Sequence, residues 1–294
     1  MHIVINGSKC TETSITASNK LATWIASTVN ATLVDDKVLA TKAWDYEIDI
    51  AFLINTNYGF CDFRNEIVAL CRKAKQVIWI GNDYVLTMGG TFYWLRKDPK
   101  FRRFAQYSNT DKLPNHVYMD FNKLLHWDGE KRDYKHSGMF YYGSYRPDRL
   151  NSFKHWLSEN QIPLHVSTSA RNAENFHSIN RKMKVYKGDR DIRKVLPLFQ
   201  SSIYIEDDAT HETLMTPANR FYETIGAKVL MLYDVKTKKT LDSAGYWDDA
   251  FAVSDQADVA EKLKKYDTLR EKQIEMFKGR DFKAELKNEF LKAL

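Results

Sequence analysis

The residues best suited to chemistry follow a short apolar run, Ser202–Ile205. A polar loop leads to Thr216, which suits the N-cap of a helix, and to Pro217, which suits its first turn because proline has no amide hydrogen to leave unbonded. Arg220 and Glu223 lie three positions apart and therefore share one helical face. A carboxylate there can accept both hydroxyls of a ribose, and the guanidinium beside it can hold a diphosphate. An ordinary surface ion pair fits the same spacing.

A turn after the apolar run Gly138–Tyr142 offers a second anion site. Gly143 lets the backbone approach a ligand closely, and it is followed by Ser144 and the start of a helix, where free amides favour an anion. Arg146 and Arg149 supply guanidinium groups for phosphate. The alternative is a plain tight turn with two exposed arginines.

A candidate general base, Asp83, follows the buried run Gln76–Ile80. The carboxyl end of a parallel strand lines the ligand side of an α/β sheet, so a carboxylate there can take a proton from an acceptor hydroxyl. An aspartate in this position is equally typical of a turn or a helix cap.

Basic and aromatic residues are interleaved in the segment that follows Asp83, a pattern typical of nucleic-acid-binding surfaces. The basic side chains can hold a phosphate backbone, and an aromatic ring can fill the space of an extruded base. The predicted DNA-binding residues are Trp94, Arg96, Lys97, Lys100, Arg102 and Arg103. An amphipathic helix, with its aromatic residues in the core and its basic face in solvent, fits the same composition.

The histidines and cysteines show no spacing typical of a metal site, so no protein-held metal is predicted. The acidic run Glu206–Asp208 can hold Mg²⁺ or Mn²⁺ beside a diphosphate, or it can be a solvated loop. Three cysteines without a CxxC pair argue against a disulfide framework. We therefore expect a reducing, cytoplasmic location, which is the host cytoplasm if the gene belongs to a bacteriophage.

The 294 residues are enough for two cores, and the formal net charge of +6 is compatible with an anionic partner. No apolar run approaches the ~20 residues of a membrane helix, and the N-terminus does not resemble a secretory signal. A membrane partner is therefore not expected.

Apolar runs of strand length alternate with segments of helical period, which predicts parallel sheets flanked by helices. The alternation is interrupted over residues 97–137, where we expect a domain boundary. We predict an N-terminal domain (residues 1–136) that binds the acceptor, a second domain (137–278) that binds a nucleotide, a cleft between them, and a C-terminal helix (279–294) that returns to the first domain. The predicted strands are 2–6, 48–54, 76–80, 138–142, 163–166, 202–205 and 228–233, and the predicted helices are 18–29, 63–74, 148–160, 191–199 and 217–225.

Several blocks of the sequence resemble the GT-B glycosyltransferases, and among them the phage DNA β-glucosyltransferases, which place glucose on hydroxymethylated cytosine in duplex DNA. The resemblance spans nearly the whole chain and is dense in Gly138–Asp234. The resemblance rests on four blocks of sequence, which occur in the order MHIVIN, FYYGSYRPDR, RFYETIGAKVLMLYD and ELKNEFLKAL.

The resemblance implies two Rossmann-like domains, a UDP-sugar donor, most simply UDP-glucose, and a hydroxymethylated pyrimidine in double-stranded DNA as acceptor. Asp83 matches the family's general base. The residues that match its donor-binding positions are Gly143, Ser144, Arg146, Thr216, Arg220 and Glu223, with Arg149 one place from a second loop arginine.

The stereochemistry can also be predicted. Retaining GT-B enzymes usually carry a second glutamate eight positions before the ribose-binding one, where this chain has Met215, and the absence favours inversion. Two alternatives stay open: the same enzyme acting on a polysaccharide, lipid or protein acceptor, and a nucleic-acid-binding protein on an inactive GT-B scaffold.

Overall fold

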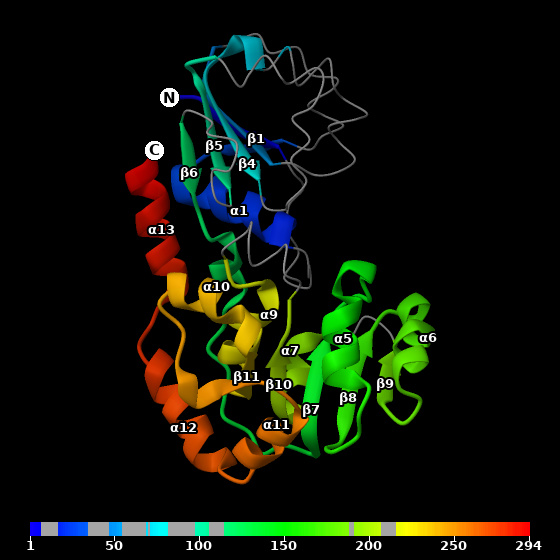
Figure 1. Cartoon of the computed structure of the whole chain (residues 1–294). Coiled ribbons are helices and arrows are strands. Elements are labelled where there is room, and N and C mark those ends of the chain that lie inside the picture. The colour runs from blue at the N-terminus through cyan, green and yellow to red at the C-terminus, as the bar shows by residue number, and fades with distance from the viewer. Residues whose placement is uncertain are drawn as a thin grey trace. The chain divides into compact units, whose positions relative to one another are not determined.

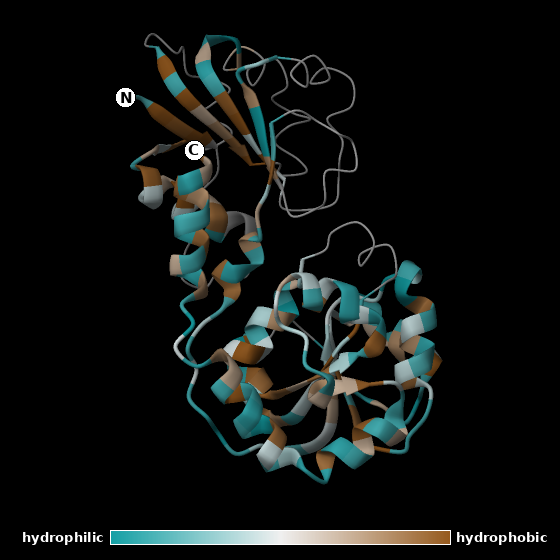
Figure 2. Ribbon diagram, turned by 60° about the vertical axis from the view of Figure 1, so that its left-hand side comes forward, coloured by the Kyte–Doolittle hydropathy of each residue, from teal (hydrophilic) through white to brown (hydrophobic). Residues whose placement is uncertain are grey.

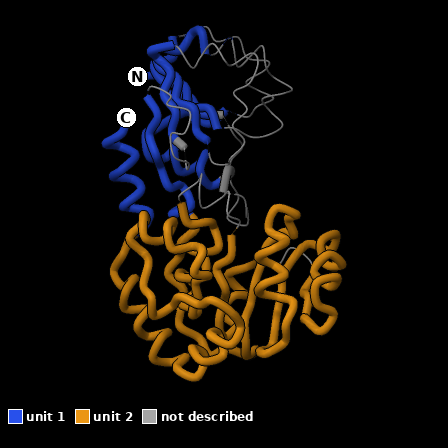
Figure 3. Tube along the Cα trace, viewed as in Figure 1, with its two compact units in different colours: residues 1–124, 282–294 blue, residues 125–281 orange. Residues whose placement is uncertain are grey.

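The computed structural model describes residues 1–6, 17–34, 47–54, 69, 71–81, 98–105, 115–187, 191–206 and 216–294. The chain divides into two compact units (Figure 3). Unit 1 comprises residues 1–124 and 282–294, and unit 2 comprises residues 125–281. The first unit therefore ends about a dozen residues before the boundary that the sequence suggested, and it includes the C-terminal helix.

Unit 1 contains a parallel six-stranded sheet with the strand order β2-β1-β3-β4-β5-β6 (Figure 1). The strands are β1 Ile3–Asn6, β2 Thr32–Val34, β3 Ile48–Ile54, β4 Ala74–Gly81, β5 Phe101–Ala105 and β6 His116–Tyr118. Its helical elements include α1 Ala17–Val29 and α13 Phe282–Ala293, and the 3-10 turn η2 Phe121–Leu125 lies at the end of the unit's first segment.

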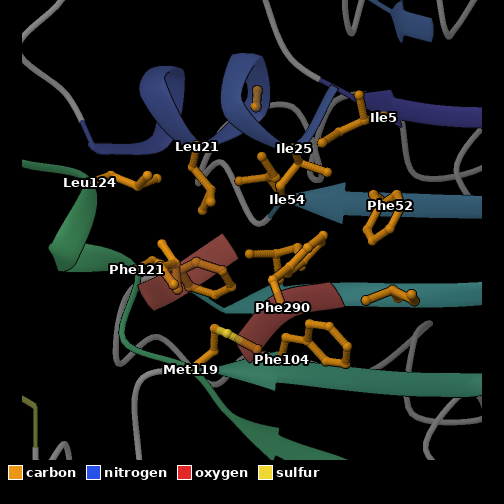
Figure 4. Close-up of a cluster of buried hydrophobic side chains, with 14 of the residues drawn as sticks. Ile5, Leu21, Ile25, Phe52, Ile54, Phe104, Met119, Phe121, Leu124 and Phe290 are labelled. Carbon is orange, nitrogen blue, oxygen red and sulfur yellow. The ribbon is translucent and has the colours of Figure 1, made fainter. Parts of the chain in front are cut away.

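Strands β1, β3 and β4 of this sheet are mostly apolar because both faces of the sheet are covered there, as is usual for parallel sheets (Figure 2). Successive side chains point to opposite faces, so Ile78 and Trp79 of β4 belong to different clusters. The C-terminal helix α13 supplies Phe290 to the cluster that also holds α1 (Figure 4). Its ring centroid lies 5.2 Å from that of Trp24 and 5.7 Å from that of Phe104.

Unit 2 contains a second parallel six-stranded sheet, with the order β12-β11-β10-β7-β8-β9. The strands are β7 His136–Tyr142, β8 Leu164–Thr168, β9 Lys184–Lys187, β10 Phe199–Tyr204, β11 Leu230–Asp234 and β12 Ala252–Val253. The α-helices are α5 Leu150–Leu157, α6 Ala170–Ile179, α7 Ile192–Val195, α9 Asn219–Gly226, α10 Lys238–Ser243, α11 Gln256–Leu263 and α12 Tyr266–Phe277. The 3-10 turns are η3 Pro147–Arg149, η4 Leu196–Leu198, η5 Val235–Thr237 and η6 Asp249–Phe251.

The strand order of unit 2 reverses direction between β7 and β10. The chain first adds β8 and β9 on one side of β7, and then β10, β11 and β12 on the other. In such doubly wound sheets, ligands bind outside the carboxyl ends of the two strands that flank the reversal. The residues after β7 and after β10 are therefore the place to look for a site.

The segment that the sequence left without a clear period contains regular structure. Phe101–Ala105 is strand β5, which pairs with β4 on one side and β6 on the other. An amphipathic helix is therefore wrong for these residues. The predicted helix over 191–199 is present as α7 followed by a 3-10 turn at Leu196–Leu198, and only its last residue, Phe199, belongs to strand β10.

Candidate functional site

The loop after β7 makes a close approach to the start of α9. Gly143 has φ +146°, a conformation that residues with a Cβ rarely adopt. A Cβ on this glycine would lie 3.2 Å from the hydroxyl oxygen of Tyr141 and 3.3 Å from Nη2 of Arg220. The loop therefore requires glycine both for its backbone conformation and for its packing against the arginine.

The next loop residues reach solvent. Ser144 and Arg146 are exposed, and the guanidinium of Arg146 lies 3.4 Å from the carboxylate of Asp148. An exposed pair of this kind contributes little to stability, so Arg146 can exchange its partner for a ligand at small cost.

Helix α9 begins two residues after the expected start. Its N-cap is Ala218, whose backbone is extended and which provides no side-chain cap. The amide of Ala218 donates to the hydroxyl of Tyr204 over 2.8 Å, so this backbone donor at the helix start is satisfied. Thr216 is buried just before this extended segment, so its predicted N-cap role is wrong.

Two arginines at this edge of the sheet share one buried carboxylate. Nη2 of Arg149 lies 2.6 Å from Oε2 of Glu206, and Nη1 of Arg220 donates to Oε1 of the same residue. The Glu206 side chain is fully buried, while those of Arg149 and Arg220 are 8% and 11% exposed. Three charged groups with a net charge of +1 thus lie together at the carboxyl ends of β7 and β10.

Arg220 is fixed by further contacts. Its Nη1 also donates to the backbone oxygen of Ile205 over 2.6 Å, and its Cζ lies 5.1 Å from the ring centroid of Tyr141. Burial alone would lower the pKa of Arg220, but the Glu206 carboxylate and the neighbouring tyrosines together outweigh it and raise the pKa above its ordinary value. The cation is therefore permanent and has a defined direction.

Glu223 lies one helical turn beyond Arg220 and is 9% exposed. The phenol of Tyr142 donates to its Oε2 over 2.7 Å. Burial, and then the Glu223 carboxylate, raise the pKa of Tyr142 well above its ordinary value, so the phenol stays protonated and remains a donor. A carboxylate held in this way still has acceptor capacity for the hydroxyls of a ligand.

Three hydroxyl groups near this edge are buried with no hydrogen-bond partner among the residues that the structure describes. They belong to Tyr141, Thr168 and Ser169. Tyr141 is in β7, Thr168 ends β8 and Ser169 follows it. Because buried polar groups are nearly always bonded, these unpartnered hydroxyls fit a site that takes a polar ligand.

Several predicted residues cannot be placed. Asp83, Trp94, Arg96 and Lys97 lie outside the described residues, as do Asp207 and Asp208. Within the described ranges, no three His, Cys, Asp or Glu side chains gather into a group that could hold a metal ion. No helix in the same ranges is long and apolar enough to span a bilayer.

The other three predicted DNA-binding residues contact unit 1 itself. Lys100 donates to the backbone oxygen of Ala74 over 3.2 Å, and Arg102 donates to the backbone oxygens of Ala293 and Leu294 in the C-terminal segment. Arg103 is 2% exposed, so a contact between its guanidinium and a phosphate would require this side chain to leave the interior.

The role of Glu206 was not predicted from the sequence. As the first member of an acidic run, this residue suggested only a metal ligand or a solvated loop. The available signal was its position directly after the apolar run Ser202–Ile205, because a charge so close to a buried strand requires a buried partner.

Comparisons with known proteins give matches in fold. No protein-family model matches the sequence, and a search of curated proteins found no match. An alpha-glucosyltransferase, solved with UDP and a 13-mer DNA containing a central A:G mismatch, matches with a TM-score of 0.61 and 10% identity, over 100% of this chain and 99% of its own. HepE of Anabaena, solved with UDP and glucose, matches with a TM-score of 0.58 and 10% identity, over 99% and 98%. With its two parallel six-stranded sheets, this chain has the GT-B fold, as the matching structures do.

Proposed function

We propose that the protein is a glycosyltransferase that uses a UDP-sugar donor. The observation that carries the proposal is the placement of Arg220 and Glu223 on one face of α9, at the carboxyl ends of β7 and β10. A permanent cation and a carboxylate one helical turn apart match a diphosphate and a ribose. Both matching folds were solved with UDP, which supports the choice of nucleotide.

In this proposal the donor's diphosphate lies against Gly143, Ser144, Arg146, Arg149 and Arg220, and its ribose against Glu223. The guanidinium groups stabilise the negative charge that develops on the diphosphate as the bond to the sugar breaks. The loop amides after Gly143 add donors for the same charge.

We assign the role of base to Asp83, which follows β4 by two residues, on the strength of the sequence resemblance. The acceptor oxygen attacks the anomeric carbon, and its proton passes to the Asp83 carboxylate. The bond between that carbon and the diphosphate breaks, and UDP leaves with the electron pair. A single displacement of this kind inverts the anomeric centre. One of the two matching structures is that of an alpha-glucosyltransferase, so the anomeric linkage in the product of this protein has to be measured.

For the acceptor we propose a hydroxymethylated pyrimidine in double-stranded DNA. The basic and aromatic segment after Asp83 supports this choice, as does the DNA bound to the first matching structure. The remaining phosphate contacts in this proposal come from Arg96 and Lys97, with Trp94 as the ring that replaces an extruded base.

The test is to incubate the protein with a panel of UDP-sugars and duplex DNA containing each modified pyrimidine, and to determine the masses of the digested nucleosides. A hexose added to one nucleoside supports both donor and acceptor. Hydrolysis of a UDP-sugar without transfer to any DNA supports the donor and points to a polysaccharide, lipid or protein acceptor. If the protein shows no transfer, no hydrolysis and no UDP binding, the proposal is overturned.

A further inference from the structure

The buried carboxylate of Glu206 connects two arginines that come from different parts of unit 2. Arg149 ends η3 after β7, and Arg220 is the second residue of α9. Each carboxylate oxygen pairs with a different guanidinium, since Oε2 is 2.6 Å from Nη2 of Arg149 and Oε1 accepts from Nη1 of Arg220. One side chain thus determines the positions of both cations.

A fully buried carboxylate is costly unless it is paired with a cation. A carboxylate between two guanidinium groups also offsets the repulsion between them. A purely structural role would be complete if all donors of Arg220 were used within the protein. Among the residues that the structure describes, its Nε has no hydrogen-bond partner.

Within the described ranges, the bonds of Arg220 to Glu206 and to the backbone oxygen of Ile205 both come from the same guanidinium nitrogen, Nη1. Its Nε is buried with no hydrogen-bond partner among the described residues, and Nη2 lies 3.3 Å from the position of a Cβ on Gly143. Glu206 therefore holds the guanidinium at one end and leaves donors at the other, beside the loop that we assign to the diphosphate.

We propose that Glu206 is a positioning residue for donor binding, which orients Arg149 and Arg220 so that their guanidinium groups meet a diphosphate. This inference rests on the proposed UDP-sugar activity. The alternative is competition, in which Glu206 would occupy the place of the diphosphate and would have to be displaced. The two roles predict opposite changes in diphosphate affinity when the charge of Glu206 is removed. Positioning predicts that removal of the charge weakens diphosphate binding, whereas competition predicts that it strengthens binding.

The test compares the affinities of UDP and uridine for the full-length protein by calorimetry. Glu206→Gln preserves the shape of the side chain and removes its charge. UDP affinity should fall by about tenfold or more, because orientation of charge-assisted bonds is lost, while uridine affinity should change by less than about twofold. Glu206→Asp keeps the charge on a shorter side chain and should recover part of the UDP affinity.

A matched control is Asp234→Asn, which neutralises another buried carboxylate of unit 2. Asp234 accepts from Nε1 of Trp156 over 2.7 Å and is not part of the arginine cluster. This variant should lower thermal stability while leaving the ratio of UDP to uridine affinity unchanged. If Glu206→Gln does not fold, Glu206→Asp becomes the test, with an expected loss in that ratio of about threefold.

The outcomes separate the inference from the proposed function. If the wild-type protein binds UDP and Glu206→Gln leaves the ratio unchanged, the inference is wrong and the proposed function stands. Tighter UDP binding by Glu206→Gln would also overturn it, in favour of competition. Failure of the wild-type protein to bind UDP would overturn both.

Discussion

Tyr142 and Glu223 are joined by a hydrogen bond of 2.7 Å, in which the phenol donates to the carboxylate. Tyr142 ends β7 and Glu223 lies in α9, so this bond connects the strand that precedes the glycine loop to the helix that carries Arg220. It fixes the direction of the carboxylate that we assign to the ribose.

Replacement of this phenol should affect nucleoside binding. Tyr142→Phe removes the donor that orients the Glu223 carboxylate. We expect the affinities of uridine and UDP to fall together, by roughly fivefold for the loss of ~1 kcal/mol. Calorimetry with both ligands checks this. A loss restricted to UDP would show that Tyr142 acts on the diphosphate instead.

Replacement of Arg220 should weaken the binding of UDP and not that of uridine. Arg220→Ala removes a permanent, buried cation, so UDP affinity should fall by ~1.5–3 kcal/mol while uridine affinity changes little. Arg146→Ala, at an exposed arginine, should cost UDP binding less because water screens its charge. Equal losses of UDP and uridine on replacement of Arg220 would remove it from the phosphate site.

The glycine loop offers a matched pair of substitutions. Gly143 has φ +146° and close neighbours, whereas Gly245 has φ +73° and nothing within 4 Å of an added Cβ. Both changes to alanine should lower the free energy of unfolding, by roughly 1–3 kcal/mol. Only Gly143→Ala should also weaken UDP binding, because its methyl group meets Nη2 of Arg220. Thermal denaturation with and without UDP measures both effects, and unchanged UDP binding in Gly143→Ala would separate the loop from the diphosphate.

Stability should fall at alkaline pH. Burial raises the pKa values of Tyr142, Tyr204 and Tyr233 above their ordinary value of 10.0. Above pH ~10 the unfolded chain loses these phenolic protons while the folded protein keeps them. The unfolded state then binds fewer protons, so the free energy of unfolding decreases as pH rises past ~10, whereas below it the contribution is fully present.

Urea titrations at a series of pH values, followed by tyrosinate absorbance, would measure this decrease. Tyr204→Phe removes one of the protons and should make the pH dependence shallower. A free energy of unfolding that stays constant between about pH 9 and pH 11 would contradict the expectation.

Catalysis should depend on Asp83. Asp83→Asn cannot accept the acceptor's proton, so transfer should fall by ~10²–10⁴-fold while UDP affinity stays nearly unchanged. The control is Asp49→Asn, at a partly exposed aspartate near the start of β3 that pairs with Lys75 of β4. Transfer assays and product linkage decide the outcome. Near-normal turnover by Asp83→Asn would exclude the assigned base, and an α-linked product from an α-linked donor would exclude inversion.

The alternation of apolar runs was sufficient to predict the longer strands of both sheets, because β3, β4, β7 and β10 are buried on both faces. The missed strands are short or carry charge. β12 has two residues, and β9 is an edge strand that begins and ends with exposed lysines. Strand β5 was also missed, because it contains two adjacent arginines, although its residues Phe101 and Phe104 are buried.

At the site, helical spacing predicted that Arg220 and Glu223 lie together, since both belong to one element. The Arg149–Glu206 pair joins two loops that are far apart in sequence, and only the order of β7 and β10 in the sheet brings them together. Local sequence patterns can indicate that Glu206 needs a buried partner, but they do not identify Arg149 as that partner.

The participation of α13 in unit 1 has a consequence for biosynthesis. Leu286 and Phe290 complete a core whose other members come from residues before 125, and all of unit 2 is translated between the two parts. Unit 2 is continuous and can fold as soon as it leaves the ribosome. The sheet of unit 1 emerges first, yet the part of its apolar face that Phe290 contacts, including Phe52 and Phe104, lacks this cover until α13 is added. The nascent chain therefore exposes an aggregation-prone surface throughout the synthesis of unit 2, and the two units should become native in the reverse of their order of synthesis.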